Sequence, residues 1–169
     1  MEPAENHRHP ARQGALSLVK FCLRLSGAML AFTALEGRAA DSPPVFTGVV
    51  EPILARTCVS CHGEKKQKKN LRLDSLAAIM KGGKDGAVVV PGKADDSDLV
   101  QRLHLDLTDD DHMPPKSKTQ MSDKEILILE WWINSGAPGD VPLNSLQVPD
   151  AVKAAIHDLG SGSKLAAVK

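Results

Sequence analysis

The stretch RTCVSCHGE, residues 56–64, constrains the fold more than any other part of this 169-residue chain. It places two cysteines three positions apart, with a histidine directly after the second. On a helical turn Cys58, Cys61 and His62 fall on one face, because residues three and four apart are neighbours there. The fold must therefore present two thiols and one imidazole to the same space.

Three kinds of chemistry use such a motif. A structural zinc site draws four ligands from Cys and His, so zinc would need His62 and a second, distant histidine. A thioredoxin-like pair sits at a helix start after a strand, and no parallel-strand pattern precedes Cys58. Covalent haem attachment needs two thiols for the vinyl groups and an adjacent imidazole for the iron. The motif supplies all three groups and favours haem c, with a thiol redox pair and zinc as alternatives.

The first 40 residues are typical of an export signal. An uncharged, mostly apolar run occupies residues 25–35, and small residues near Ala39 and Ala40 offer a cleavage site. The leader before that run is basic, with Arg8, Arg12, Lys20 and Arg24. We therefore predict a signal peptide over residues 1–40 and a periplasmic or otherwise exported protein. An uncleaved N-terminal membrane anchor is the alternative, although the apolar run is short for a bilayer span. Cys22 lies in this leader, so the exported chain keeps Cys58 and Cys61.

Charge and aromatic content narrow the class of protein further. Lys plus Arg and Asp plus Glu number 21 each, so no net field points to nucleic acid or a membrane surface as partner. The chain has no Tyr, two Trp and three Phe. Because aromatic rings normally supply much of a buried core, a bound cofactor would be a source of the missing apolar volume.

Helical signals surround the motif. Before Cys58, apolar residues recur at helical spacing, and Pro52 must kink or restart that helix. Short helices are expected from about Ser75 to before Gly82 and within DDSDLVQRL, residues 95–103. The apolar residues before the motif are Phe46, Val49, Val50, Ile53 and Leu54.

A stronger helix closes the pattern. Ser122 and Glu125 form a capping box, and Gly136 with Pro138 ends the helix. The sequence EILILEWWINS, residues 125–135, is apolar around most of its circumference, so it must be buried on more than one side. Trp131 and Trp132 are expected in the core. The fold class is therefore mainly α.

Five ordered blocks give the chain a family resemblance. They are FTGVVEPILARTCVSCHG, LRLDS, VPGKADDSDLVQRL, HMPP and EILILEWWINSGAP. Their order resembles a small class I cytochrome c and, more closely, the planctomycete-type cytochrome c domain. The resemblance implies a domain over residues 41–139 whose first and last helices pack around one covalently attached haem. It implies thioether bonds at Cys58 and Cys61, with His62 as the proximal and Met113 as the distal iron ligand.

The distal position has rivals in His104 and His112, while His157 is remote. Pro114 and Pro115 restrict the backbone around Met113, which favours an extended segment. In extended geometry, neighbouring side chains point to opposite faces, so only one of His112 and Met113 can face the iron. Met113 ligation would give a higher reduction potential than His112 ligation.

Other charged residues carry weaker hypotheses. Arg102 would reach a haem propionate through its forked donors, or it forms a surface ion pair. The run 65–69 docks an acidic redox partner, or it is a solvated loop. Its lysines are Lys65, Lys66, Lys68 and Lys69. The aspartates at 109–111 do not match a calcium loop and favour an acidic turn.

Residues 140–169 begin as a Pro-rich linker and continue as an amphipathic helix from about Asp150 to Leu159. This tail either packs on the domain or trails in solvent. As a whole, the sequence favours an exported c-type cytochrome that exchanges single electrons with redox proteins, and a carrier rather than a catalyst. The alternatives are a haem enzyme with an open distal position and a thiol–disulfide redox protein using Cys58 and Cys61.

Overall fold

The computed structural model of the protein describes residues 42–161, so the predicted leader lies outside the described residues. The described part is helix-rich, as the sequence predicts. A π-helical turn, η1, spans Phe46–Val50, and a small hairpin pairs β1 (His62–Gly63) with β2 (Lys66–Gln67). The helices are α1 (Glu51–Thr57), α2 (Leu76–Lys81), α3 (Asp98–His104), α4 (Asp123–Asn134) and α5 (Asp150–Ser161), with short 3-10 turns at Lys68–Asn70 and Leu143–Ser145.

The predicted interruption at Pro52 takes the form of a change in helix type. In η1 the N–H of Glu51 donates to the carbonyl of Phe46, five residues back, and α1 begins at Glu51. Proline lacks an N–H and is tolerated in the first turn of a helix, where that donor has no intrahelical partner. The helix therefore restarts at Pro52 and continues to the first cysteine.

The capping box of α4 forms as predicted. Glu125 Oε2 accepts from the Ser122 N–H at 2.8 Å and from the Ser122 hydroxyl at 2.7 Å. The Arg56 guanidinium also donates to Glu125, so the start of α4 is tied to α1. Beyond the helix end, Gly136 has a φ of +92°, a conformation in which the absence of a Cβ removes the steric cost.

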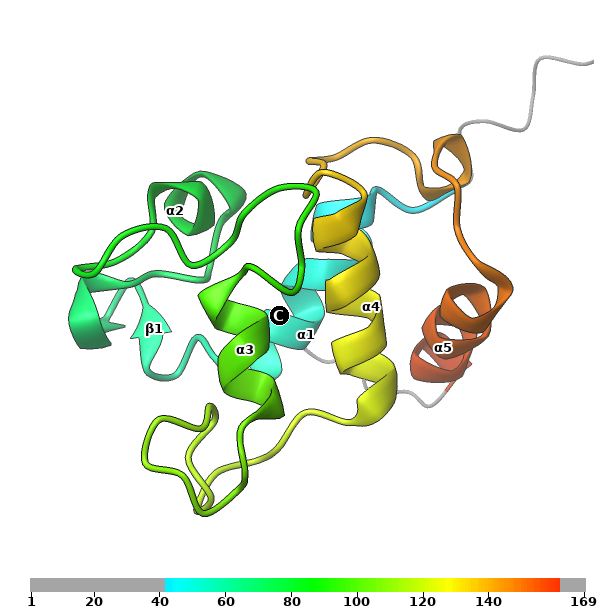
Figure 1. The fold of residues 1–169 in the computed structure, drawn as a ribbon. Helices are drawn as coiled ribbons and strands as arrows, with labels where there is room; N and C mark the ends of the chain where they lie inside the picture. The colour runs from blue at the N-terminus through cyan, green and yellow to red at the C-terminus, as the bar shows by residue number, and fades with distance from the viewer. Residues whose placement is uncertain (1–41, 162–169) are drawn as a thin grey trace, which may run out of the picture. The chain divides into compact units, whose positions relative to one another are not determined.

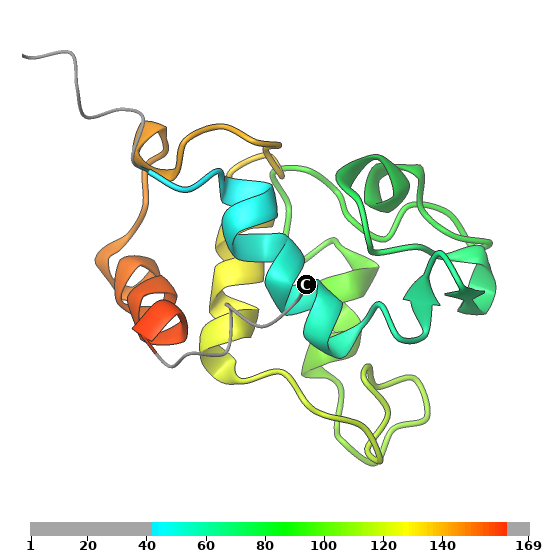
Figure 2. The ribbon, with the colours of Figure 1, turned by 180° about the vertical axis from the view of Figure 1, so that it is seen from behind.

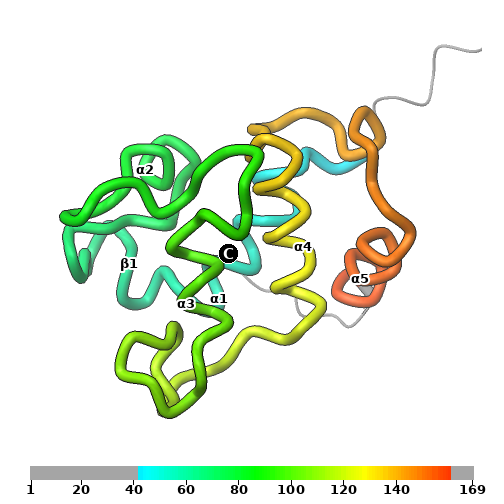
Figure 3. The backbone as a smooth tube through the Cα atoms, in the orientation of Figure 1, coloured from blue at the N-terminus to red at the C-terminus, as the bar shows by residue number. Residues whose placement is uncertain are grey.

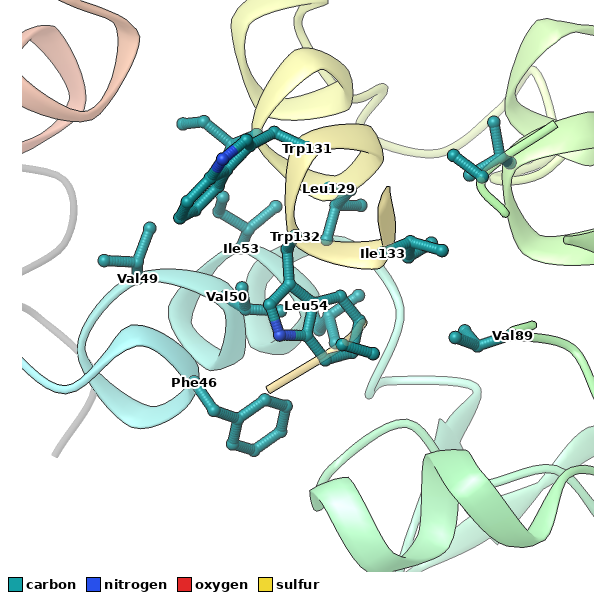
Figure 4. Packing of buried hydrophobic residues seen from close by; sticks show 14 of the residues in the cluster. Phe46, Val49, Val50, Ile53, Leu54, Val89, Leu129, Trp131, Trp132 and Ile133 are labelled. Carbon is teal, nitrogen blue, oxygen red and sulfur yellow. The ribbon is translucent and has the colours of Figure 1, made fainter. Parts of the chain in front are cut away.

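The core lies where η1 and α1 face α4 (Figure 4). Phe46 and Trp132 pack with ring centroids 5.9 Å apart, and the Trp132 indole N–H donates to the Pro138 carbonyl at 2.9 Å. The prediction that Trp131 and Trp132 are core residues is confirmed, because both are buried. Other buried members of this cluster are Val49, Val50, Ile53, Leu54, Leu129 and Ile133.

Helix α4 separates two sets of elements. In the two opposite views, α5 lies on one side of α4, while α2, α3 and the hairpin lie on the other (Figures 1 and 2). Val152 and Ala155 of α5 are each 2% exposed, and Lys124 of α4 pairs with Asp158 of α5 at 2.5 Å. The C-terminal helix therefore packs on the domain, the first of the two alternatives left by the sequence.

The segment after α4 is also hydrogen-bonded to the beginning of the described chain. The Val45 N–H donates to the Val141 carbonyl at 3.0 Å, and the Leu143 N–H donates to the Pro43 carbonyl at 2.9 Å. Residues 43–45 and 141–143 thus run side by side, which ties the beginning of the described chain to the segment between α4 and α5. Within residues 42–161, no helix is long and apolar enough to cross a membrane.

The Arg56–Glu125 pair predicts a pH-dependent contribution to stability. Burial opposes ionisation of Glu125, but its hydrogen bonds with Ser122 and Arg56 hold the pKa of Glu125 below its ordinary value. A folded-state pKa below the unfolded one stabilises the fold above the unfolded pKa of about 4.3 and loses that effect as pH falls through the folded pKa. Glu125→Gln should therefore lower the free energy of unfolding by about 1–3 kcal/mol at pH 7.

Denaturant unfolding of the wild type and Glu125→Gln at a series of pH values checks this expectation. The difference between the two proteins should shrink steadily as the pH falls below about 4. Asp123→Asn, on the exposed face of the same helical turn, is the matched control and should cost only a few tenths of a kcal/mol. An equal difference at pH 7 and at low pH would contradict the role assigned to the ionised carboxylate.

Candidate haem-attachment site

The three residues of the motif form one turn directly after α1. Cys58 is the C-cap of that helix, and its carbonyl accepts hydrogen bonds from Cys61 N–H at 3.0 Å and His62 N–H at 2.9 Å. Both cysteines are free thiols and both are partly exposed. The two thiols and the imidazole are thereby held within five residues of rigid backbone.

The imidazole of His62 is oriented by the loop that follows it. Its Nδ1 lies 3.1 Å from the Lys68 carbonyl oxygen, which can only accept, so Nδ1 carries the proton. This tautomer leaves Nε2 with the lone pair that a metal requires. Burial lowers the pKa of His62, with an opposing effect from the backbone carbonyls of Lys68 and Leu71. The neutral form that binds metals is therefore favoured.

Gly63, which follows the motif, is required by the tightness of the turn. A Cβ at this position would lie 2.6 Å from the Val59 carbonyl oxygen and 2.7 Å from the Val59 side chain. Any larger residue would force the turn to open. Gly63 was not predicted as a site residue, although its position directly after His62 is visible in the sequence.

The environment of Cys58 does not favour thiol–disulfide exchange. Burial raises the pKa of its thiol, although the Thr57 hydroxyl, 3.4 Å from the sulfur, and the Arg56 charge act in the opposite direction. Cys58 also sits at the C-terminal end of α1, where the helix dipole disfavours a negative charge. Reactive redox thiols instead have a lowered pKa, commonly at a helix N-terminus.

The described residues do not support a structural zinc site either. Among the residues that the structure describes, no group of three or more His, Cys, Asp or Glu side chains is placed to hold a metal ion. The donor chemistry of the turn, two thiols and one oriented imidazole, instead fits a haem held by thioether bonds and one axial histidine.

Met113 lies in the segment between α3 and α4, residues 105–122. It is partly buried, and its backbone N–H donates to the carbonyl of Arg102 at 3.0 Å. This bond anchors Met113 to the last turn of α3. The segment and the Cys58–His62 turn lie on the same side of α4, away from α5 (Figure 3).

Both histidine rivals of Met113 are engaged elsewhere. His112 is 8% exposed, with Nδ1 at 2.9 Å from the Leu105 carbonyl oxygen and Nε2 at 3.0 Å from Gln120 Oε1. His104 Nε2 lies 2.5 Å from Glu130 Oε1 on α4. Of the three side chains considered for the distal position, Met113 is the one without such a bond among the described residues.

The expectation of an extended distal segment is wrong. Residues 107–111 form turns, the chain bends at Met113 and Pro114, and the peptide bond between these two residues is cis. Asp106 Oδ1 accepts from the Thr108 N–H at 2.8 Å, and Asp109 Oδ1 accepts from the Asp111 N–H at 2.8 Å. Such local bonds are how aspartate stabilises turns, so the acidic run shapes the loop.

Arg102 forms ion pairs in the structure. Its Nε lies 2.8 Å from Asp98 Oδ2, and its Nη1 lies 3.1 Å from Asp111 Oδ1. The guanidinium thus joins α3 to the distal segment. A haem propionate would have to share a group that already holds two carboxylates, and that role stays a prediction.

The lysine run lies on β2 and the 3-10 turn after it. All five residues of 65–69 are exposed, and they directly follow the Cys58–His62 turn. Their positive charge is therefore accessible to another molecule close to the site. Docking of an acidic redox partner at these lysines stays a prediction.

The described part is a helix-rich domain with a turn that carries two thiols and one oriented imidazole. Residues 58–117 match the family model described as Planctomycete cytochrome C. The match begins at the first cysteine of the motif and extends past Met113, and it confirms the resemblance stated from the sequence over this segment. No curated protein and no solved structure matches the chain.

Proposed function

We propose that the protein is an exported c-type cytochrome that carries single electrons through one covalently bound haem. The observation that carries the proposal is the turn in which Cys58, Cys61 and His62 share one set of backbone hydrogen bonds, with His62 oriented through Nδ1. When bound, the haem supplies a one-electron ferric/ferrous couple. The family match over residues 58–117 supports the same cofactor.

The residues have distinct roles in this proposal. Cys58 and Cys61 hold the cofactor by thioether bonds, and His62 ligates the iron through Nε2. Met113 would be the second protein ligand to the iron, and its thioether would raise the reduction potential relative to a second histidine. In a class I-like arrangement, α1 delivers the attachment turn and α4 closes the core behind it. Arg102 would contribute a propionate contact as a secondary role.

A haem enzyme with an open distal position is the second candidate. It would need Met113 to leave the iron accessible, as would be seen in a high-spin spectrum. The anchoring of Met113 to Arg102 and the engagement of both rival histidines favour a fixed sixth ligand instead. The carrier role is therefore the one that we propose.

The intact mass and absorption spectrum of the exported protein test the proposal together. We expect one added haem that persists in denaturant, a mass lacking residues 1–40 and a low-spin, six-coordinate spectrum. An unmodified mass would refute haem attachment. A high-spin spectrum would favour the enzyme, and a retained leader would favour a membrane-anchored form.

The exposed lysines predict electrostatic steering of a negatively charged partner. Lys66→Glu should slow electron exchange with an anionic reagent such as ferricyanide severalfold at low salt, because accessible positive charge raises the encounter rate. The difference should fade as salt rises, since charges are screened beyond about 10 Å at 0.1 M. Stopped-flow mixing at several salt concentrations measures both effects.

The matched control is Lys153→Glu, an equal change of charge on α5, on the other side of α4. It should leave the rate within about twofold at low salt, because the effect of an exposed charge falls off with distance. Equal slowing by both substitutions would mean that only net charge matters. The lysine run would then be a solvated loop without a docking role.

A further inference from the structure

The side chain of Gln120 connects both flanks of Met113. Its Nε2 lies within hydrogen-bond distance of three carbonyl oxygens, at 3.1 Å from Pro114, 3.1 Å from Pro115 and 2.9 Å from Lys118. Its Oε1 lies 3.0 Å from His112 Nε2. One amide group therefore bonds the residue before Met113 and the two residues after it.

His112 extends this network to the end of α3. Its Nδ1 lies 2.9 Å from the carbonyl oxygen of Leu105, the C-cap of that helix. Because this oxygen and Gln120 Oε1 both accept, the two contacts are hydrogen bonds together when each ring nitrogen of His112 carries a proton. Gln120 itself lies directly before Met121 and the Ser122 cap of α4. The chain of bonds thus runs from Leu105 at the start of the loop to Gln120 near its end, and Met113 lies between them.

The loop has few other means of fixing Met113. Pro114 and Pro115 have no N–H and cannot donate to a neighbouring strand or turn. Pro114 is buried, and a buried carbonyl that lacks a partner is costly. The Gln120 amide supplies a donor to that carbonyl, while the Pro115 carbonyl also accepts from the Lys118 N–H at 2.8 Å. The three carbonyls in turn fix which atom of the amide faces His112.

We propose that Gln120 is the positioning residue for Met113, and that His112 connects the end of α3 to the Gln120 amide. The inference rests on the proposed function, since it takes Met113 as an iron ligand. Gln120 and His112 act on the iron only through the position of Met113. Loss of their bonds should allow Met113 to leave the iron more often, so that an added ligand competes more easily.

Imidazole titration of the haem-loaded ferric protein tests this inference. Gln120→Ala should raise the apparent affinity for imidazole about tenfold, because at least two hydrogen bonds are lost. It should also weaken the long-wavelength band of sulfur-ligated ferric haem. Gln101→Ala is the matched control, since Gln101 Nε2 donates to the Asp95 carbonyl at 2.8 Å outside the loop. The apparent affinity of this variant for imidazole should equal that of the wild type.

A second variant separates positioning from folding. Gln120→Glu keeps the oxygen that faces His112 and removes the donor to the three carbonyls. This variant should therefore also raise the apparent affinity for imidazole. His112→Ala should do the same, and the double variant with Gln120→Ala should show less than the product of the two effects, because both belong to one network. Independent, multiplicative effects would overturn the coupling between Gln120 and His112.

The Met113→Ala variant separates failure of the proposed Met113 ligation from failure of the Gln120 positioning role alone. If Met113→Ala leaves the band and the imidazole affinity unchanged, Met113 is not the ligand and the proposed ligation fails. If Met113→Ala removes the band but both Gln120 variants bind imidazole like the wild type, the positioning role alone is refuted.

Discussion

Replacement of Met113 by Ala is expected to abolish the weak long-wavelength band of sulfur-ligated ferric haem. The reduction potential should fall by on the order of 100 mV, within the range of about 0.8 V over which axial ligands set haem potentials. The physical reason is that a thioether favours the ferrous state more than the histidine or water that would replace it. Optical spectra and a redox titration measure the two effects.

His112→Ala serves as the discriminating variant. Both ring nitrogens of His112 are bonded, to the Leu105 carbonyl and to Gln120, so the ring is not available as a ligand. The band should therefore persist in the absence of added imidazole, weakened no more than in Gln120→Ala. Met80→Ala, at an exposed position on α2, controls for the loss of any methionine. Loss of the band in His112→Ala would show that the ligand assignment is wrong.

Removal of both attachment thiols should have the second large effect. The variant Cys58→Ala/Cys61→Ala should lack covalent haem and melt at least about 10 °C lower, because a ligand that binds only the folded state stabilises it. The sequence indicates that a cofactor would supply apolar volume that the aromatic residues do not. The structure nevertheless contains a cluster of buried protein side chains around Val50, Leu54 and Trp132.

We therefore expect the double cysteine variant to lose structural order in some segments more than in others. Hydrogen exchange should increase most in residues 105–120, where the described chain buries only His112 and Pro114, and least in α1 and α4. Ser60→Ala, an exposed position between the two cysteines, should change neither the melting temperature nor the exchange pattern. A wild-type melting curve for the double variant would contradict a stabilising role for the cofactor.

The helices were predictable because their signals are local. Ser122 and Glu125 form a capping box within four residues, and Pro52 must either kink a helix or restart it. The burial of Trp131 and Trp132 was predictable because residues 125–135 are apolar around most of the helix circumference. One neighbouring element cannot cover that much apolar surface. The Cys58–His62 turn was equally visible, since its three residues lie within five positions.

The distal segment was less predictable because its geometry depends on side-chain hydrogen bonds that proline restriction does not reveal. Proline restriction indicated an extended backbone, whereas Asp106 and Asp109 stabilise turns through their own side chains. The contacts of Gln120 span up to eight positions, and no local pattern marks that residue. The packing of α5 likewise depends on a tertiary contact with α4.

The pairing of residues 43–45 with 141–143 has a consequence for how the protein could be tethered. Ser42 Oγ accepts from the Asn144 N–H at 3.0 Å, so the point where any upstream segment joins the domain is fixed beside the 3-10 turn. That point lies across α4 from the Cys58–His62 turn and the lysine run (Figures 1 and 2). A domain immobilised there, on an electrode or at a lipid surface, would turn the side that carries the Cys58–His62 turn and the lysine run outward toward solution.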